Sequence, residues 1–217
     1  MNASKSNWLF IWRTASSFNN AYFASDNDAM SSVSCIKDLG VIIGCDLSFS
    51  KNVDDITRRA YQRTCMIYKG FVSRDKIMLS KAYATSVRPL LEYCTQIWSP
   101  TYVTDIVKIE KVQKYYTKRI SSISNLSYKQ RLQCLKLDSL ELRRLYFDMR
   151  IVYTIIQGLI DVAFDDLFTF SPNRSTRGYV YKLYCSKSNL NVRSNFSHNA
   201  ISQHGTLYQM MLIHLRL

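Results

Sequence analysis

The chain has 217 residues, of which 47% are hydrophobic and 21% are charged, so it is long and apolar enough to bury a core. Its 29 lysines and arginines exceed its 16 aspartates and glutamates, and the net charge of +13 favours a polyanionic partner, nucleic acid before a membrane. No apolar run is long enough to cross a bilayer and no secretory leader pattern is found, which argues against membrane partners. The six widely scattered cysteines favour reduced thiols in a nuclear or cytoplasmic protein.

The first 49 residues predict a small β element. Trp8–Trp12 and Ala21–Phe23 are each expected to form a short strand, with a polar loop between them. Residues 33–49, VSCIKDLGVIIGCDLSF, predict one apolar strand that is interrupted by Gly40 and ended by Gly44. A glycine inside a strand indicates a bulge or a close approach of the backbone to another group.

The first long helix is expected over Ser50–Lys69, with Ser50 as its N-cap and Gly70 after its end. Its apolar residues recur at helical spacing on one side. They are Val53, Ile56, Ala60 and Ile67. Its basic residues fall elsewhere on the helix. They include Arg58, Arg59 and Arg63.

The next helix is expected to begin at Ser73. Pro89 lacks a backbone N–H and clashes with the preceding turn, so this helix should stop or kink at Arg88. A further segment, Leu90–Trp98, should be apolar up to the stop at Ser99-Pro100.

The clearest helix is expected over Asp105–Ser121. One face is apolar, with Ile109, Val112, Tyr116 and Ile120, and the rest is basic, with Lys108, Lys111, Lys114, Lys118 and Arg119. In most proteins a lysine stripe of this kind is only a solvated helix face. Here the segment from Lys51 to Arg131 holds 16 basic residues against 6 acidic ones, a net charge of +10. Charge concentrated in this way is typical of phosphate contacts.

Two more helices are predicted, a short one over Ser127–Leu135 and a long one over Ser139–Gly158. The long helix has a wide apolar stripe that should pack in the core. The stripe consists of Leu142, Leu145, Met149, Val152, Tyr153 and Ile156, with Arg143, Arg144 and Arg150 off it. Residues 162–203 are expected to be mostly irregular.

Residues that could hold a metal or carry out catalysis do not cluster in the sequence. The six cysteines include no Cys-x-x-Cys pair, and the three histidines lack ligand spacing. The pairs Asp54-Asp55 and Asp165-Asp166 lack the acidic partners on separate strands that two-metal nucleotidyl transfer needs. No glycine-rich phosphate loop or nucleophile elbow occurs. We therefore expect no catalytic residues, no metal site and no cofactor.

Several motifs follow one another in a recognisable order. They are KDLGVI at Lys37–Ile42, DLSF at Asp46–Phe49, SVRPLLEYC at Ser86–Cys94, WSP at Trp98–Pro100, EKVQ at Glu110–Gln113 and TKRI at Thr117–Ile120. In this order and at this spacing, the chain resembles the reverse transcriptases of non-LTR (LINE-type, jockey-like) retrotransposons over about residues 2–203.

In that family the catalytic aspartates lie upstream of the KDLG motif, in a palm strand and a Phe/Tyr-Ala-Asp-Asp turn. The resemblance therefore implies a remnant palm edge over residues 1–49 with a primer-grip-like KDLG strand, a helical thumb over 50–161 and a C-terminal extension over 162–203. A longer parent RNA-directed DNA polymerase would supply the missing palm domain. The chain by itself is then expected not to be an enzyme.

The resemblance also predicts that residues 204–217 are an out-of-frame tail. Family members continue after Phe-Ser-His with a Trp-Asn-Ser-Leu-Pro segment, which this chain lacks. The codons CAT-GGA-ACT-CTT-TAC-CA would encode His204 to Gln209, and they give Trp-Asn-Ser-Leu-Pro when read from the third base. The nucleotide sequence tests this hypothesis directly.

Together the residues predict a mainly α fold with a small N-terminal β element, in which a helical thumb-like bundle follows a remnant palm hairpin. Three functional hypotheses stay open: a catalytically incompetent polymerase fragment that binds RNA or DNA backbone without sequence preference, a non-enzymatic helical protein-interaction module, and a functionless translated remnant. The candidate nucleic-acid-binding residues are Lys37, Gly40, Arg58, Arg59, Arg63, Lys108, Lys111, Lys114, Lys118 and Arg119.

Overall fold

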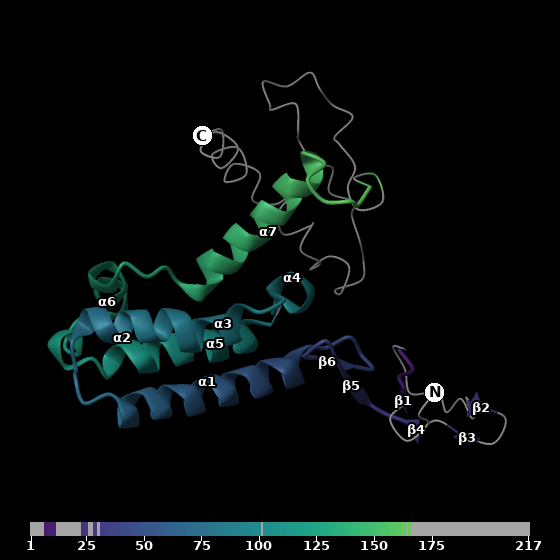
Figure 1. Cartoon of the computed structure of the whole chain (residues 1–217), viewed down its shortest axis with the longest axis horizontal. Helices are drawn as coiled ribbons and strands as arrows, with labels where there is room; N and C mark the ends of the chain where they lie inside the picture. Colours follow the sequence, from purple (N-terminus) through teal and green to yellow (C-terminus); the bar gives the residue numbers. More distant parts are fainter. Residues whose placement is uncertain are drawn as a thin grey trace.

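The computed structural model describes residues 7–11, 23–25, 28–29, 31–100, 102–163 and 165. It is mainly helical, with a small N-terminal strand element and a helical bundle, as the sequence predicts (Figure 1). The predicted irregular extension, apart from its first residues, and the predicted out-of-frame tail lie outside the described residues.

Short strands come first in the chain. They form two pairs, β1 (Asn7–Trp8) with β4 (Ser31–Ser32) and β2 (Phe23–Ser25) with β3 (Asp28–Ala29). The strand predicted over Trp8–Trp12 is therefore wrong in extent, because residues 9–11 are described but not extended into the ladder. Of the strand predicted over Ala21–Phe23, only Phe23 belongs to the described residues.

The single strand predicted within residues 33–49 is instead an antiparallel hairpin. Its strands are β5 (Cys35–Asp38) and β6 (Val41–Gly44), with Cys35 opposite Gly44 and Asp38 opposite Val41. Leu39 and Gly40 both have positive φ, +44° and +89°, and two such residues reverse the chain in the tightest hairpin turns. The KDLG motif is thus the end of one strand and its turn, and Gly40 marks a reversal rather than a bulge.

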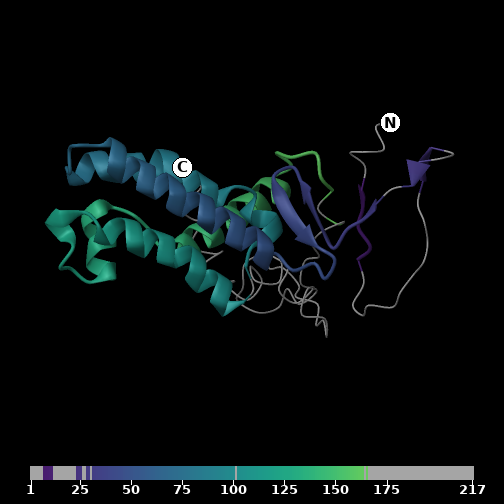
Figure 2. The ribbon, with the colours of Figure 1, turned by 90° about the horizontal axis from the view of Figure 1, so that it is seen from below.

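Two hydrogen bonds fix this hairpin to the bundle. The Ile42 N–H donates to Oδ1 of Asn52 at 3.1 Å, and Asn52 is only 1% exposed. The hydroxyl of Tyr93 donates to the Leu39 carbonyl at 3.0 Å, at the hairpin turn. Because Asn52 lies in α1 and Tyr93 follows α3, the hairpin is held from two separate parts of the bundle (Figures 1 and 2).

Helix α1 spans Ser50–Gly70, and its predicted apolar side is confirmed. Val53, Ile56, Ala60 and Ile67 are all buried in one hydrophobic cluster. The predicted cap is wrong, because Ser50 is already helical and Phe49 holds the N-cap position. The Ser50 hydroxyl instead donates to Oδ2 of Asp105 at 2.6 Å, so it joins α1 to a helix far along the chain.

Helix α2 spans Lys76–Ala82 and begins later than predicted. Asp75 is its N-cap, and its carboxylate accepts from the N–H groups of Ile77 and Met78 at 3.0 Å each. Such a cap satisfies backbone donors that have no partner within the helix, which explains a start after Asp75 rather than at Ser73.

The helix does not stop at Arg88. It continues through a π-helical segment, Tyr83–Val87, into α3 (Arg88–Glu92), which contains Pro89. The Arg88 N–H donates to the Tyr83 carbonyl, five residues back. This wider turn, typical of π-bulges, lies where the ring of Pro89 would clash with a regular α-helical turn.

The segment predicted over Leu90–Trp98 is interrupted. Cys94 has a φ of +53°, which breaks the helix between α3 and α4 (Thr95–Trp98). The break is stabilised by Trp98, a fully buried residue whose Nε1 donates to the Tyr93 carbonyl at 2.6 Å. The predicted stop at Ser99-Pro100 is confirmed, since α4 ends at Trp98.

Helix α5 spans Val103–Lys118, and its predicted apolar face is fully buried. It runs parallel to α1: the Ser50–Asp105 bond joins their first turns, and near their last turns the Tyr68 hydroxyl donates to the Tyr116 carbonyl at 2.8 Å. Both helices therefore point away from the hairpin, side by side (Figures 1 and 2).

Helices α6 (Tyr128–Leu135) and α7 (Leu140–Ile156) begin where the sequence predicts. Ser127 forms a capping box with Gln130, and Ser139 accepts from the Leu142 N–H. A short 3-10 turn, Ser121–Ile123, separates α5 from α6.

The apolar stripe predicted on α7 is partly wrong. Met149 and Val152 are buried, but Leu142 is 50% exposed, whereas Arg144 and Asp148 are only 4% and 6% exposed. Leu140, directly after the cap, is the buried leucine at the start of this helix. The helix packs on α4 and α5 through a face that includes the two charges, which apolar periodicity cannot predict.

Asp148 makes the stability of the protein depend on pH. Burial raises the pKa of its carboxyl to about 6, although the charge of Arg144 opposes this shift. Because this value lies above the unfolded value of 3.8, the ionised carboxylate destabilises the native state once pH rises through about 6. We expect Asp148→Asn to raise the unfolding free energy above that pH by about 1–3 kcal/mol and to change it little in acid.

Urea unfolding of the variant and the wild type at a neutral and an acidic pH measures this effect. Asp161→Asn, at an exposed position, is the matched control and should change neither value. An equal effect of Asp148→Asn at both pH values would contradict the prediction.

Candidate nucleic-acid interface

Two of the predicted contact residues lie on the hairpin. Lys37 is exposed on β5, close enough to Asp55 for its charge to help lower the pKa of that carboxyl. Gly40 is exposed in the turn, where its φ of +89° favours glycine whether or not anything binds nearby. The hairpin therefore adds one cation to the surface near the start of α1.

The predicted arginines nearest the start of α1 are paired. Asp55 accepts from Nη2 of Arg58, and its other oxygen lies 3.0 Å from Nε of Arg59. Burial raises the pKa of Asp55, but the Arg58 hydrogen bond and the charges of Arg59, Arg58 and Lys37 outweigh it and hold the pKa below its usual value. Arg58 and Arg59 thus carry a charge that is partly neutralised.

Lys108, near the start of α5, is paired in the same way. Its Nζ lies 2.8 Å from Oδ1 of Asp54 and 3.5 Å from Oδ1 of Asp105. The hydrogen bond with Asp54 raises the pKa of Lys108. Since Asp54 belongs to α1, this lysine joins the two helices, and the role the structure gives it is an interhelical ion pair.

The C-terminal parts of α1 and α5 differ from the starts of these helices because they contain no acidic residue. No acidic residue occurs from 56 to 74 or from 111 to 137. Because α1 and α5 pack in parallel, the first residues of these two acid-free segments lie in the same region of the bundle. We call these residues the basic end. They are Arg63, Lys69, Lys111, Lys114, Lys118 and Arg119, all exposed.

No ion pair involves any residue of the basic end within the described part of the chain. Two of its members instead lie over aromatic rings. Cζ of Arg119 is 4.9 Å from the ring centre of Tyr68 and 5.2 Å from that of Tyr115, and Nζ of Lys114 is 5.2 Å from that of Tyr128. These contacts fix where the side chains lie and leave their charges uncompensated.

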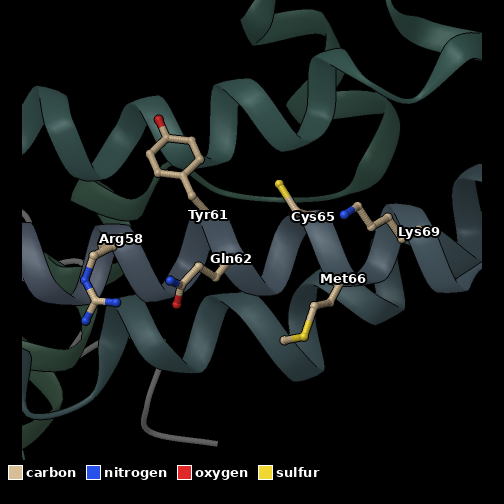
Figure 3. A pocket seen from close by; sticks show the side chains of 6 residues that line it. All are labelled: Arg58, Tyr61, Gln62, Cys65, Met66 and Lys69. Carbon is tan, nitrogen blue, oxygen red and sulfur yellow. The ribbon is translucent and has the colours of Figure 1, made fainter.

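The sequence prediction missed a groove beside the basic end. It is an open groove of about 670 Å³ along the outer side of α1 (Figure 3). Its lining consists of Arg58, Tyr61, Gln62, Cys65, Met66 and Lys69. The ring of Tyr61 packs edge to face against Tyr115 of α5, with ring centres 5.3 Å apart. These residues recur at spacings of three and four on the side of α1 opposite its apolar face, and this spacing was visible in the sequence.

Over the residues described here, no group of three or more His, Cys, Asp or Glu side chains could hold a metal ion. Within the same residues, every helix is too short or too polar to cross a membrane.

Comparison with known proteins shows a similarity over part of the chain. No family model matches the chain, and no solved structure matches it. An uncharacterized protein of Caenorhabditis elegans is 25% identical over 126 residues, which cover 57% of this chain and 64% of the relative. The chain therefore spans less than two thirds of that relative's length, and the match assigns no activity to the interface.

Proposed function

We propose that the chain binds nucleic acid without sequence preference, through the phosphate backbone, at the basic end of the α1–α5 pair. The observation that carries the proposal is the parallel packing of these helices, which gathers six uncompensated cations where neither helix has a carboxylate. Clustered lysines and arginines of this kind neutralise phosphates and release counterions.

The motif order supports a more specific form of the proposal. In that form the chain is a fragment of a non-LTR retrotransposon reverse transcriptase, and the bundle is its thumb. Residues 1–217 contain no counterpart of the family's catalytic aspartates. The chain alone should therefore bind a template–primer duplex without extending it.

Titration of a labelled oligonucleotide at two salt concentrations tests the proposed function. If five or six phosphate contacts form at the basic end, affinity should fall by roughly 10³-fold between about 50 and about 200 mM salt. Oligonucleotides of unrelated sequence should bind about equally well. Binding that is absent at low salt, or insensitive to salt, would contradict the proposal and favour a protein-interaction module or a remnant.

A further inference from the structure

The groove on α1 combines cations with an aromatic ring. Arg58 and Lys69 stand at its two ends, about three helical turns or roughly 16 Å apart. Tyr61, Cys65 and Met66 lie between them, and Met66 is 57% exposed (Figure 3). At a rise of about 3.4 Å for each stacked nucleotide, that length accommodates about five nucleotides of one strand.

Tyr61 is the aromatic residue that lines this groove. It packs against the hydrophobic core, and its ring forms an edge-to-face pair with that of Tyr115. The face of Tyr115 is already occupied by Arg119, whereas Tyr61 lines the groove. Burial, and to a lesser degree Tyr115, raise the pKa of Tyr61 above its usual value.

We infer that this groove binds single-stranded nucleic acid, with a base stacked on Tyr61 and the flanking phosphates near Arg58 and Lys69. An aromatic side chain in a basic groove is the usual arrangement for single strands, because every base offers a flat face. In a duplex the bases stay stacked on one another, so a duplex can contact only the cations of the groove, through its phosphates. The inference rests on the proposed function and adds a site that favours unpaired strands to the general binding of phosphate backbones.

Two substitutions at Tyr61 test the inference in the full chain. Tyr61→Leu keeps an apolar side chain but removes the ring, and Tyr61→Phe keeps the ring as the matched control. Fluorescence anisotropy would measure binding of a labelled single-stranded oligodeoxynucleotide and of the duplex formed with its complement. We expect Tyr61→Leu to weaken single-strand binding roughly tenfold, with duplex binding unchanged, and Tyr61→Phe to bind both like the wild type.

Alkylation of Cys65 gives a second measurement that needs no substitution. Cys65 is a free, half-buried cysteine in the groove, and Cys45, free and half-buried beside the hairpin, serves as the internal reference. The single strand should slow modification of Cys65 several-fold relative to Cys45, as measured by mass spectrometry.

The outcomes separate the two proposals. Salt-sensitive binding that is equal for single strand and duplex, unaffected by Tyr61→Leu and without Cys65 protection would overturn this inference and leave the proposed function standing. Absence of any binding would overturn both. If Tyr61→Leu fails to fold, as judged by circular dichroism, Cys65 protection in the wild-type protein decides.

Discussion

Replacing Lys111, Lys114 and Lys118 together by glutamate is expected to weaken nucleic-acid binding by roughly a hundredfold or more at low salt. All three residues are exposed on α5, and none is held by an ion pair in the described part of the chain. The change removes three cations and adds three anions where a phosphate backbone would lie. The slope of log affinity against log salt should also decrease by about three units.

A control with the same charge change shows whether position matters. Lys37, Lys51 and Arg150 are exposed on β5, on the first turn of α1 and on α7, away from the basic end. Their triple replacement by glutamate lowers the net charge equally. We expect it to weaken binding several-fold at most, and an effect as large as that at Lys111, Lys114 and Lys118 would contradict a localised interface.

The largest expected effect on stability comes from Gln113, a fully buried residue of α5. Its Oε1 accepts from the Tyr83 hydroxyl at 2.7 Å, and its Nε2 donates to the Asp138 carbonyl at 2.8 Å. It thereby joins the π-helical segment to the chain before α7. Gln113→Leu should lower the free energy of unfolding by roughly 3 kcal/mol, because it leaves two groups without these hydrogen bonds, one of them a buried hydroxyl.

A double-mutant cycle tests that explanation. Tyr83→Phe removes the hydroxyl that Gln113→Leu would leave unpaired, so the double variant should be more stable than the sum of the two single effects predicts, by about 1–2 kcal/mol. Urea unfolding of the four proteins measures the coupling. Strict additivity would show that the bond between Tyr83 and Gln113 contributes nothing to folding.

Helix positions could largely be predicted from the sequence, because their signals are local. The helices predicted to start at Ser127 and Ser139 begin directly after these serines, which cap them by satisfying free backbone donors. The apolar faces of α1 and α5 follow from spacing alone. The hairpin could not be separated from a bulged strand in this way, because its turn depends on a positive φ at Leu39, a residue type that rarely adopts one.

The basic residues of the proposed interface could be named from the sequence, but not their pairing or their positions relative to one another. All ten candidate residues were predicted from their charge or from the family motifs. In the structure, however, Arg58, Arg59 and Lys108 form ion pairs with carboxylates. Gly40 lies in the hairpin turn. The Lys108–Asp54 pair joins residues that are 54 positions apart. Tyr61 and Tyr115 were missed, because their contact exists only once α1 and α5 pack together.

The sequence by itself determined a basic, mainly helical chain and the apolar face of each long helix, because helical periodicity and charge are properties of neighbouring residues. Only the tertiary structure decided that α1 and α5 run parallel, and hence that Asp54, Asp55 and Asp105 lie near the hairpin while the acid-free segments share the other end. It also buried Arg144 and Asp148. The direction in which two helices pack depends on contacts between residues distant in the chain, which no local pattern contains.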